Sequence, residues 1–227
     1  MIKFENVSKV YENGFTALDQ INLSLKSGEL AFLTGHSGAG KTTMLKLIMC
    51  LTTPSHGRLV VAQNDVGKLS KKELPFYRRH IGMILQNPCL LPNRTVFENI
   101  ELPLIIAGYD SIECKRRVSA ALDKVNLLHK AKSYPLALST GEQQRVGIAR
   151  AVVTKPTVLL ADEPTGNLDP MLASEIMKLF EAFRQVGVCI LIATHDLALI
   201  AQMQYRIITL SGGQLISVED THELTYA

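Results

Sequence analysis

The sequence lacks the features that mark several large classes of protein. Its four cysteines are widely separated and form no C-x-x-C pair, so their spacing favours neither a zinc site nor a disulfide framework. We expect them to be small core residues in a reducing cytosol: they are Cys50, Cys89, Cys114 and Cys189. The longest apolar runs, such as residues 186–193, fall far short of the roughly 20 residues that cross a bilayer. We therefore expect that the chain does not cross a membrane by itself.

A strong excess of one charge is also missing. The 227 residues carry 24 Lys and Arg against 21 Asp and Glu, which gives no electrostatic case for a nucleic-acid partner. Residues 1–5 alternate like a strand and include an acid, unlike a secretory signal. The sequence holds no internal repeat, and its 47% of hydrophobic residues can supply a sizeable core. The length suits one α/β domain with an inserted or appended subdomain.

One motif that is present is specific for phosphate. Residues 35–42 fit G-x-x-x-x-G-K-[ST] and lie between an apolar, strand-like run at 30–33 and a helix-like run at 44–49. In this setting backbone N–H groups wrap the phosphates, and the helix points its positive dipole end at them. Lys41 supplies a charge for the β- and γ-phosphates, and the Thr42 hydroxyl can ligate Mg²⁺. The expected nucleotide contacts are Gly35, His36, Ser37, Gly38, Ala39, Gly40, Lys41, Thr42 and Thr43.

The order of the apolar runs predicts an α/β fold. Alternation over residues 2–25 indicates antiparallel strands, and helical spacing over 95–139 indicates an inserted helical subdomain. The other predicted elements are strands at 59–61, 81–85, 158–161, 189–193 and 207–210, a polar helix near 71–79, and a polar tail at 218–227. Continuous apolar strands that alternate with helices imply a parallel sheet covered on both faces. We expect a single domain over residues 1–227, with a phosphate-loop core, an N-terminal antiparallel β subdomain and the helical insertion.

Two carboxylates follow the apolar strand at 158–161, at the kind of strand end where an α/β sheet holds its ligands. Asp162 is expected to hold Mg²⁺ or its water, and Glu163 to orient and deprotonate the water that attacks the γ-phosphate. His195 follows the next strand and can hydrogen-bond the γ-phosphate. Taken alone, a histidine at this place is more often structural than catalytic.

A helix start is predicted at residues 139–142. Ser139, with Glu142 three residues later, forms a capping box, and a helix start also binds anions. Alone, this segment is an ordinary helix cap.

Taken together, these segments resemble the ATP-binding cassette ATPases over essentially the whole chain. Tyr11 resembles the aromatic residue that stacks on adenine, and Gln86 the glutamine that touches Mg²⁺ and senses the membrane partner. Residues 138–144 resemble the family signature, residues 166–169 the dimer-contact loop, and His195 the switch histidine. The resemblance implies Mg²⁺-dependent ATP hydrolysis, with Lys41, Glu163 and His195 in catalysis.

The same resemblance implies a homodimer that closes head to tail around two ATP molecules. Each ATP would lie between Lys41 of one chain and Ser139 and Gly141 of the other, so a monomer should hydrolyse poorly. Two departures bear on this expectation. Thr140 stands where the signature usually has glycine, and its side chain puts tight closure in doubt. Glu142 replaces the usual glutamine, although its acid can turn back to the cap at Ser139.

Within the family, residues 31–41, 102–108 and 116–125 resemble the ATP-binding subunits of bacterial cell-division complexes. This likeness implies a transmembrane partner subunit, control of cell-wall hydrolases, and a place on the cytoplasmic face of the bacterial inner membrane, held there only through the partner. The family places the partner's docking groove near Gln86, which here implies residues 87–100, with Leu90, Leu91, Pro92 and Phe97.

Three other functions stay open at the level of sequence. The first is an ATPase of the lipoprotein-release or macrolide-export kind, which shares all the catalytic segments. The second is a soluble cassette ATPase acting on DNA or ribosomes, which usually carries two cassettes or a long coiled coil that this chain lacks. The third is a nucleotide-binding scaffold without turnover, which gains weight from Thr140.

Overall fold

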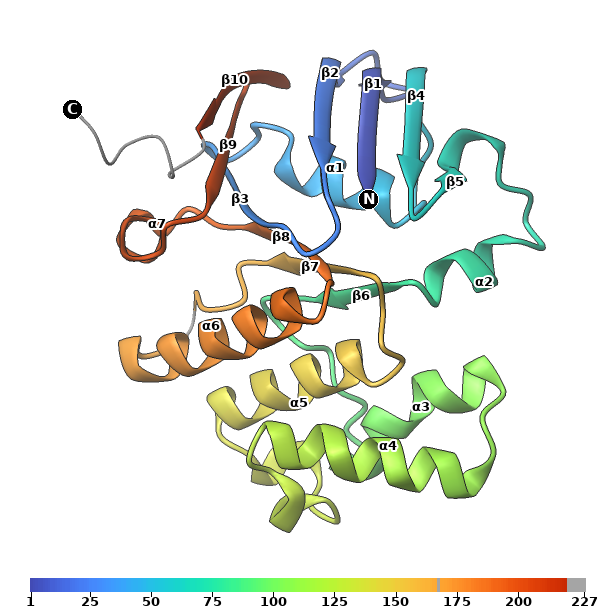
Figure 1. Ribbon diagram of the computed structural model, residues 1–227, viewed down its shortest axis with the longest axis vertical. Coiled ribbons are helices and arrows are strands. Elements are labelled where there is room, and N and C mark those ends of the chain that lie inside the picture. Colours follow the sequence, from blue (N-terminus) through green and yellow to red (C-terminus); the bar gives the residue numbers. More distant parts are fainter. Residues whose placement is uncertain (167, 220–227) are drawn as a thin grey trace.

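The computed structural model describes residues 1–166 and 168–219, which form two sheets with helices between and below them (Figure 1). The strands are β1 (Ile2–Val10), β2 (Thr16–Leu25), β3 (Leu30–Thr34), β4 (His56–Val61), β5 (Asn64–Asp65), β6 (Ile81–Ile84), β7 (Val158–Asp162), β8 (Cys189–Ala193), β9 (Arg206–Ser211) and β10 (Gln214–Glu219). The α-helices are α1 (Lys41–Ile48), α2 (Leu74–Arg78), α3 (Val96–Ala107), α4 (Ser111–Lys124), α5 (Thr140–Val152), α6 (Pro170–Gln185) and α7 (Leu197–Gln202).

The larger sheet has the order β10-β9-β3-β8-β7-β6, and all of its neighbouring strands are parallel except the β9–β10 pair. Successive residues of each central strand face opposite cores. On β7, Leu160 packs toward α1, whereas Leu159 packs toward α6 on the other face. This alternation confirms the predicted parallel sheet covered on both faces, and it explains why the strands read as continuous apolar runs.

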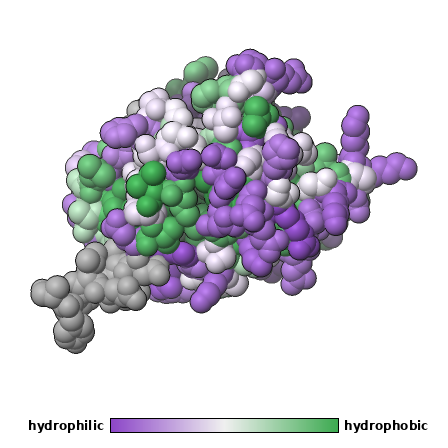
Figure 2. All heavy atoms as spheres, turned by 90° about the horizontal axis from the view of Figure 1, so that it is seen from above, coloured by the Kyte–Doolittle hydropathy of each residue, from purple (hydrophilic) through white to green (hydrophobic). Residues whose placement is uncertain are grey.

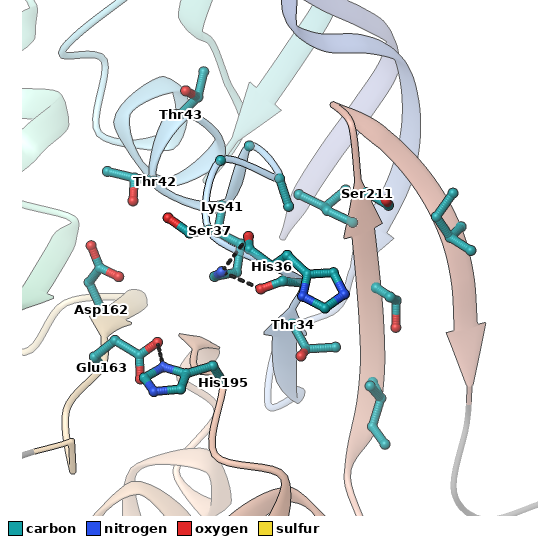
Figure 3. Close-up of a pocket in the computed structure, with 18 of the residues that line it drawn as sticks. Thr34, His36, Ser37, Lys41, Thr42, Thr43, Asp162, Glu163, His195 and Ser211 are labelled. Carbon is teal, nitrogen blue, oxygen red and sulfur yellow. Dashed lines mark hydrogen bonds and ion pairs between the residues drawn. The ribbon is translucent and has the colours of Figure 1, made fainter.

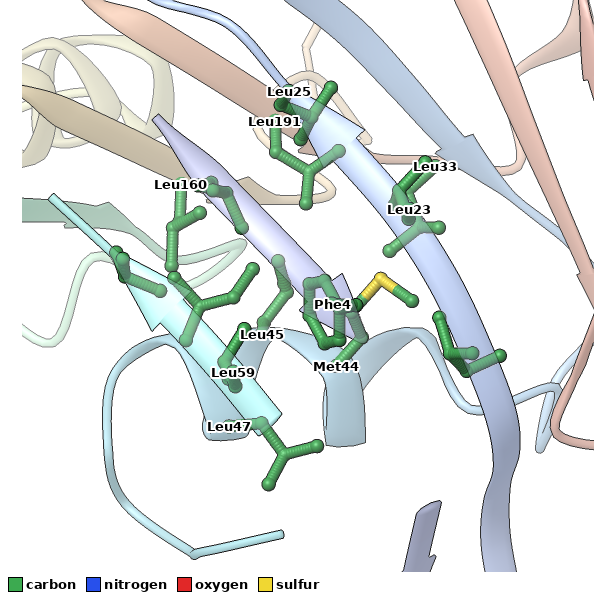
Figure 4. Packing of buried hydrophobic residues seen from close by; sticks show 14 of the residues in the cluster. Phe4, Leu23, Leu25, Leu33, Met44, Leu45, Leu47, Leu59, Leu160 and Leu191 are labelled. Atoms are coloured by element: carbon green, nitrogen blue, oxygen red, sulfur yellow. The ribbon is translucent and has the colours of Figure 1, made fainter. Parts of the chain in front are cut away.

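The smaller sheet, in the order β2-β1-β4-β5, is antiparallel throughout, as predicted for the N-terminal segment. Helix α1 lies between the two sheets. Figure 4 shows Phe4 and Leu59 of the small sheet against Met44 and Leu45 of α1, with Leu160 and Leu191 of the large sheet beyond. Burying α1 on both sides fixes the phosphate loop that precedes it.

Seen from above, the outer face is mostly hydrophilic, with a group of apolar residues toward the C-terminal side (Figure 2).

A third apolar cluster joins α3, α4 and α5. Thr95 and Glu98 form a capping box at the start of α3, and Gly108 ends this helix with a φ of 85°. Asp110 caps α4 by accepting two backbone N–H groups. The predicted insertion at 95–139 therefore contains α3, α4 and two 3₁₀ turns, at Leu128–Lys130 and Pro135–Ala137, and α5 completes its core.

Three expectations about local structure were wrong in detail. The helix near 71–79 is confined to α2, because Pro75 is tolerated only in a helix's first turn. The tail begins later than residue 218, since Val218 and Glu219 pair with β9; residues 220–227 lie outside the described part. Cys89 is exposed, whereas Cys50, Cys114 and Cys189 are buried. Within residues 1–166 and 168–219, no helix has the length and apolar character to span a bilayer.

Candidate nucleotide site

The phosphate loop connects the end of β3 to the start of α1, as the sequence predicted. Two glycines of this loop, Gly35 and Gly40, cannot be replaced by a residue with a side chain. A Cβ at Gly35 would lie 2.2 Å from the carbonyl oxygen of Leu210, and a Cβ at Gly40 would lie 2.7 Å from that of Ala17. Gly40 also has a φ of 109°, which side chains rarely adopt. The backbone therefore comes close to two neighbouring strands and wraps around a hollow in front of α1.

Lys41 is the first residue of α1, and its ammonium group folds back over the loop. Its Nζ donates to the carbonyl oxygens of Gly35, at 2.5 Å, and His36, at 3.2 Å (Figure 3). The loop thus holds a positive charge at the helix N-terminus, where a phosphate is also favoured by the helix dipole.

The loop forms one wall of an open cavity of about 1150 Å³. The other walls come from the ends of β6, β7, β8 and β9, and from residues of β2, α7 and β10. Thirteen of the sequence-predicted site residues line this cavity: Gly35, His36, Ser37, Gly38, Ala39, Gly40, Lys41, Thr42, Thr43, Gln86, Asp162, Glu163 and His195. Residues separated by more than 150 positions in the chain therefore face one space.

Glu163 is held at the cavity wall by the strand next to its own. Its Oε1 lies 2.6 Å from Nδ1 of His195, and its Oε2 accepts a hydrogen bond of 3.0 Å from the Thr194 hydroxyl. The backbone N–H of Glu163 donates to the carbonyl of Ala193 on β8, and its φ of 49° is unusual for a residue other than glycine. The glutamate side chain is only 14% exposed, whereas that of His195 is 76% exposed.

Asp162 is the last residue of β7, and it faces the phosphate loop. Burial, and then the carboxylate of Glu163, raise the pKa of Asp162, while Lys41 and Lys46 lower it. A cation placed beside Asp162 would offset the cost of burying its charge.

The donors around this point fit Mg²⁺. Figure 3 shows the hydroxyl of Thr42 directed toward the carboxylate of Asp162, and the amide of Gln86 lines the same cavity. Hydroxyl, amide and carboxylate oxygens are the hard ligands that Mg²⁺ prefers, together with water and phosphate oxygens. In the described part of the chain, no three His, Cys, Asp or Glu side chains gather into a metal cluster. The mixed set of oxygens suits an ion that arrives with a phosphate.

Three predicted contacts do not line the cavity: Tyr11, Ser139 and Gly141. The Tyr11 hydroxyl lies 3.3 Å from the hydroxyl of Thr43, so Tyr11 borders the first turn of α1. The aromatic ring in the lining belongs to Phe15, which is 56% exposed and which sequence reasoning missed. Its only signal was its position, four residues after Tyr11 and close to β2.

The signature helix α5 begins as the sequence predicted. Ser139 is its N-cap, and the Glu142 carboxylate accepts from the backbone N–H of Ser139 at 2.9 Å and from Lys130 Nζ at 2.5 Å. Gly141 is buried, and a Cβ there would lie 2.1 Å from Leu172 of α6. Thr140 is exposed in the first turn of the helix. Its side chain is therefore available to a second molecule.

Fold and site together define a phosphate-loop ATPase of the cassette type. The chain belongs to the ABC transporter family, whose family model matches residues 18–166. It is 58% identical to the cell division ATP-binding protein FtsE of Escherichia coli K12, over 95% of this chain and 97% of that protein. It is 41% identical to FtsE of Bacillus subtilis 168, over 98% of both chains.

Solved structures agree with this family. One is an ATP-binding cassette captured as a dimer in a post-hydrolysis state with ADP and Pi; it is 36% identical, with a TM-score of 0.89 over 97% of this chain and 99% of that one. Another is cbiO1 of Clostridium perfringens, part of the ABC transporter complex cbiONQ; it is 31% identical, with a TM-score of 0.90 over 98% of this chain and 89% of that one.

Proposed function

We propose that this chain binds Mg·ATP in the cavity of the phosphate loop and hydrolyses it, with Glu163 as the general base. The observation that carries the proposal is the position of Glu163, whose two carboxylate oxygens are fixed by His195 and Thr194 on the wall that faces Lys41. A carboxylate with a fixed orientation can align a water molecule and take its proton.

Each residue of the site has a distinct task in this scheme. Loop N–H groups and Lys41 bind the β- and γ-phosphates and draw off charge as the phosphoryl group is transferred. Because Nδ1 of His195 meets an ionised carboxylate, it carries the hydrogen of that contact and holds the carboxylate in place. Mg²⁺, when bound, would neutralise charge on the phosphate oxygens, and Thr42, Gln86 and Asp162 are the residues that would hold it.

The active form is a head-to-tail homodimer. Ser139 and Gly141 lie outside the cavity of their own chain, while Thr140 at the same helix start is exposed. In a dimer the start of α5 offers its N–H groups to the γ-phosphate bound by the other copy. The dimeric state of a similar cassette with ADP and Pi supports this arrangement. Within the dimer-contact loop at 166–169, Asn167 lies outside the described residues.

The biological role proposed is that of the ATP-binding subunit in a cell-division complex of the FtsE–FtsX type, where the ATP cycle signals through the membrane partner to control cell-wall hydrolysis. The identity to FtsE proteins of two distant bacteria supports it. The chain reaches the cytoplasmic face of the inner membrane through that partner.

We propose that the membrane partner binds the surface formed by residues 87–100. The fully buried Asn99 accepts from the backbone N–H of Leu91 at 2.8 Å and donates to its carbonyl at 3.1 Å. Leu91 itself is left 37% exposed, close to Gln86 in the chain. An exposed leucine on a fixed loop is the kind of anchor that protein interfaces use.

The partner is tested by reconstitution in detergent. The chain is mixed with an FtsX-type membrane protein, or with a lipoprotein-release permease as the competitor, and complex formation and ATP turnover are measured. We expect a stable complex and raised turnover with the FtsX-type protein only. Binding to the permease in its place would contradict the cell-division role and leave the ATPase site intact.

A further inference from the structure

Two side chains of helix α5, those of Gln144 and Arg150, donate hydrogen bonds to backbone carbonyls in the loop that follows β6. Gln144 Nε2 donates to the carbonyl oxygen of Leu85 at 3.1 Å. One and a half turns further on, the two terminal nitrogens of Arg150 donate to the carbonyls of Pro88 and, at 3.2 Å, of Cys89. Gln86, one of the proposed Mg²⁺ ligands, lies between these attachment points.

Packing supports the same link. Gly147 lies on α5 between the two donors, and a Cβ there would be 2.7 Å from the Cβ of Pro88. Gln144 is only 3% exposed, and burial lowers the pKa of Arg150. Loss of the hydrogen bond from a buried donor such as Gln144 is costly, so the helix and the loop hold one relative position.

The loop itself needs outside support. Cys89 has a φ of 47°, in the left-handed region that residues with a side chain rarely adopt. Among the described residues, one local hydrogen bond supports it, from its N–H to Oδ1 of Asn87 at 3.0 Å. Strained residues persist where their surroundings hold them, and here Arg150 holds the carbonyl of that residue. The amide of Gln86 then reaches the cavity wall near Gly166, whose Cβ position lies 3.4 Å from Gln86 Nε2.

We propose that Gln144 and Arg150 are positioning residues for Gln86: they fix the loop at residues 85–89 so that the Gln86 amide faces the Mg²⁺ position in the cavity. This inference rests on the proposed role of Gln86. Ser139 is the N-cap of this same helix, α5, whose start faces the other copy's nucleotide. A movement of α5 would therefore also move the loop that contains Gln86.

The chain offers a matched control in the adjacent residue. Gln143 Nε2 also donates to backbone carbonyls, those of Pro135 at 3.1 Å and Leu138 at 3.2 Å. It has the same side chain, on the same helix, with the same kind of bond. It holds a different segment, and it is half-buried where Gln144 is buried.

Two measurements on the full chain test the link. In the first, amide hydrogen exchange of residues 85–89 is measured without nucleotide for wild type, Gln144→Met and Gln143→Met. We expect Gln144→Met to speed exchange there about five- to tenfold, because a buried hydrogen bond of this kind is lost, while Gln143→Met acts at residues 135–139. Equal exchange at 85–89 in the three proteins would overturn the proposal.

The second measurement follows binding of a fluorescent ATP analogue as a function of Mg²⁺ concentration. We expect Gln144→Met to raise the Mg²⁺ midpoint about tenfold, in the same direction as Gln86→Ala, and to raise it clearly more than Gln143→Met does. Arg150→Lys tests the other attachment, since one ammonium cannot replace a planar group that reaches two carbonyls. A shift in Gln86→Ala alone would defeat the positioning roles. No shift in Gln86→Ala would defeat the proposed role of Gln86 itself, and the inference with it.

Discussion

The Oε1 atom of Glu163 lies 2.6 Å from Nδ1 of His195, across the boundary between two neighbouring strands of the parallel sheet. The sheet register sets this contact. Asp162 on β7 pairs with Ala193 on β8, so Glu163 and His195 follow the ends of two strands that lie side by side. Glu163 keeps a strained backbone at this point, with a φ of 49°. The geometry thus aims a carboxylate at the phosphate loop, at a cost that the surrounding hydrogen bonds offset.

Gly40→Ala should abolish nucleotide binding. The added Cβ would lie 2.7 Å from the Ala17 carbonyl oxygen and 2.7 Å from a methyl carbon of Leu18, so the loop must move away from its phosphate-binding shape. Gly38→Ala is the control: its Cβ meets nothing within 4 Å, and it carries only the strain of a φ of 80°, about 1 kcal/mol. ATP affinity by calorimetry separates them. Equal losses in both variants would show that backbone strain, and not the close approach, controls binding.

Thr140→Gly should raise ATP turnover several-fold and change the melting temperature by no more than a few degrees. Thr140 is exposed in the first turn of α5, so its removal costs the chain little, and a smaller residue lets a second copy approach the helix start more closely. Steady-state turnover and thermal unfolding are the two measurements. Loss of turnover in this variant would mean that the threonine contributes to the closed dimer.

Leu91→Glu should weaken binding to the membrane partner at least tenfold and leave ATP affinity unchanged, because its side chain is exposed while Asn99 fixes its backbone. Leu90→Glu is the contrast: Leu90 is partly buried against the apolar cluster of α3, α4 and α5, so a charge there should lower stability by about 1–3 kcal/mol. Parallel loss of partner binding and ATP binding in Leu91→Glu would indicate misfolding and would remove Leu91 from the interface.

Stability should fall at acid pH partly through Glu181. Arg184 donates to both of its carboxylate oxygens at 2.7 Å and, against the effect of burial, holds the pKa of Glu181 at about 2, below its ordinary 4.5. The unfolded chain binds the proton more readily, so this stabilisation is full above pH 4.5 and is lost as the pH falls toward 2.

Glu181→Gln should therefore cost about 1 kcal/mol at pH 7 and flatten the pH dependence below pH 5, as followed by urea unfolding. The control is Glu175→Gln on the same helix, whose carboxylate is 51% exposed and 4.0 Å from Arg145. An equal loss in the control would show that general surface charge, and not the Glu181–Arg184 pair, sets the acid limb.

Much of the fold and the loop of the site could be predicted because their signals are local. The phosphate loop, the capping box of Ser139 and Glu142, and the alternating strand faces each depend on residues within a few positions of one another. The resemblance to a family then added Tyr11 and Gln86, which no local pattern singles out.

The features that were missed depend on contacts between distant segments. Phe15 enters the cavity lining because the two sheets meet there, and Gln144 and Arg150 act on a loop about 60 residues earlier in the chain. Cys89 was expected in the core, but the loop that carries it turns its side chain outward while its carbonyl meets Arg150. Sequence spacing carries no information about such pairings.

We propose Glu163 as the base of an ATPase that works as a dimer. Light scattering after size-exclusion chromatography on Glu163→Gln, with and without Mg·ATP, tests this role together with the ATP turnover of variant and wild type. We expect an ATP-dependent dimer in the variant, turnover in the wild type, and a loss of at least a hundredfold in the variant. A variant that still hydrolyses ATP at the wild-type rate would contradict the role of Glu163. A variant that stays monomeric with Mg·ATP would contradict a dimer held by nucleotide alone.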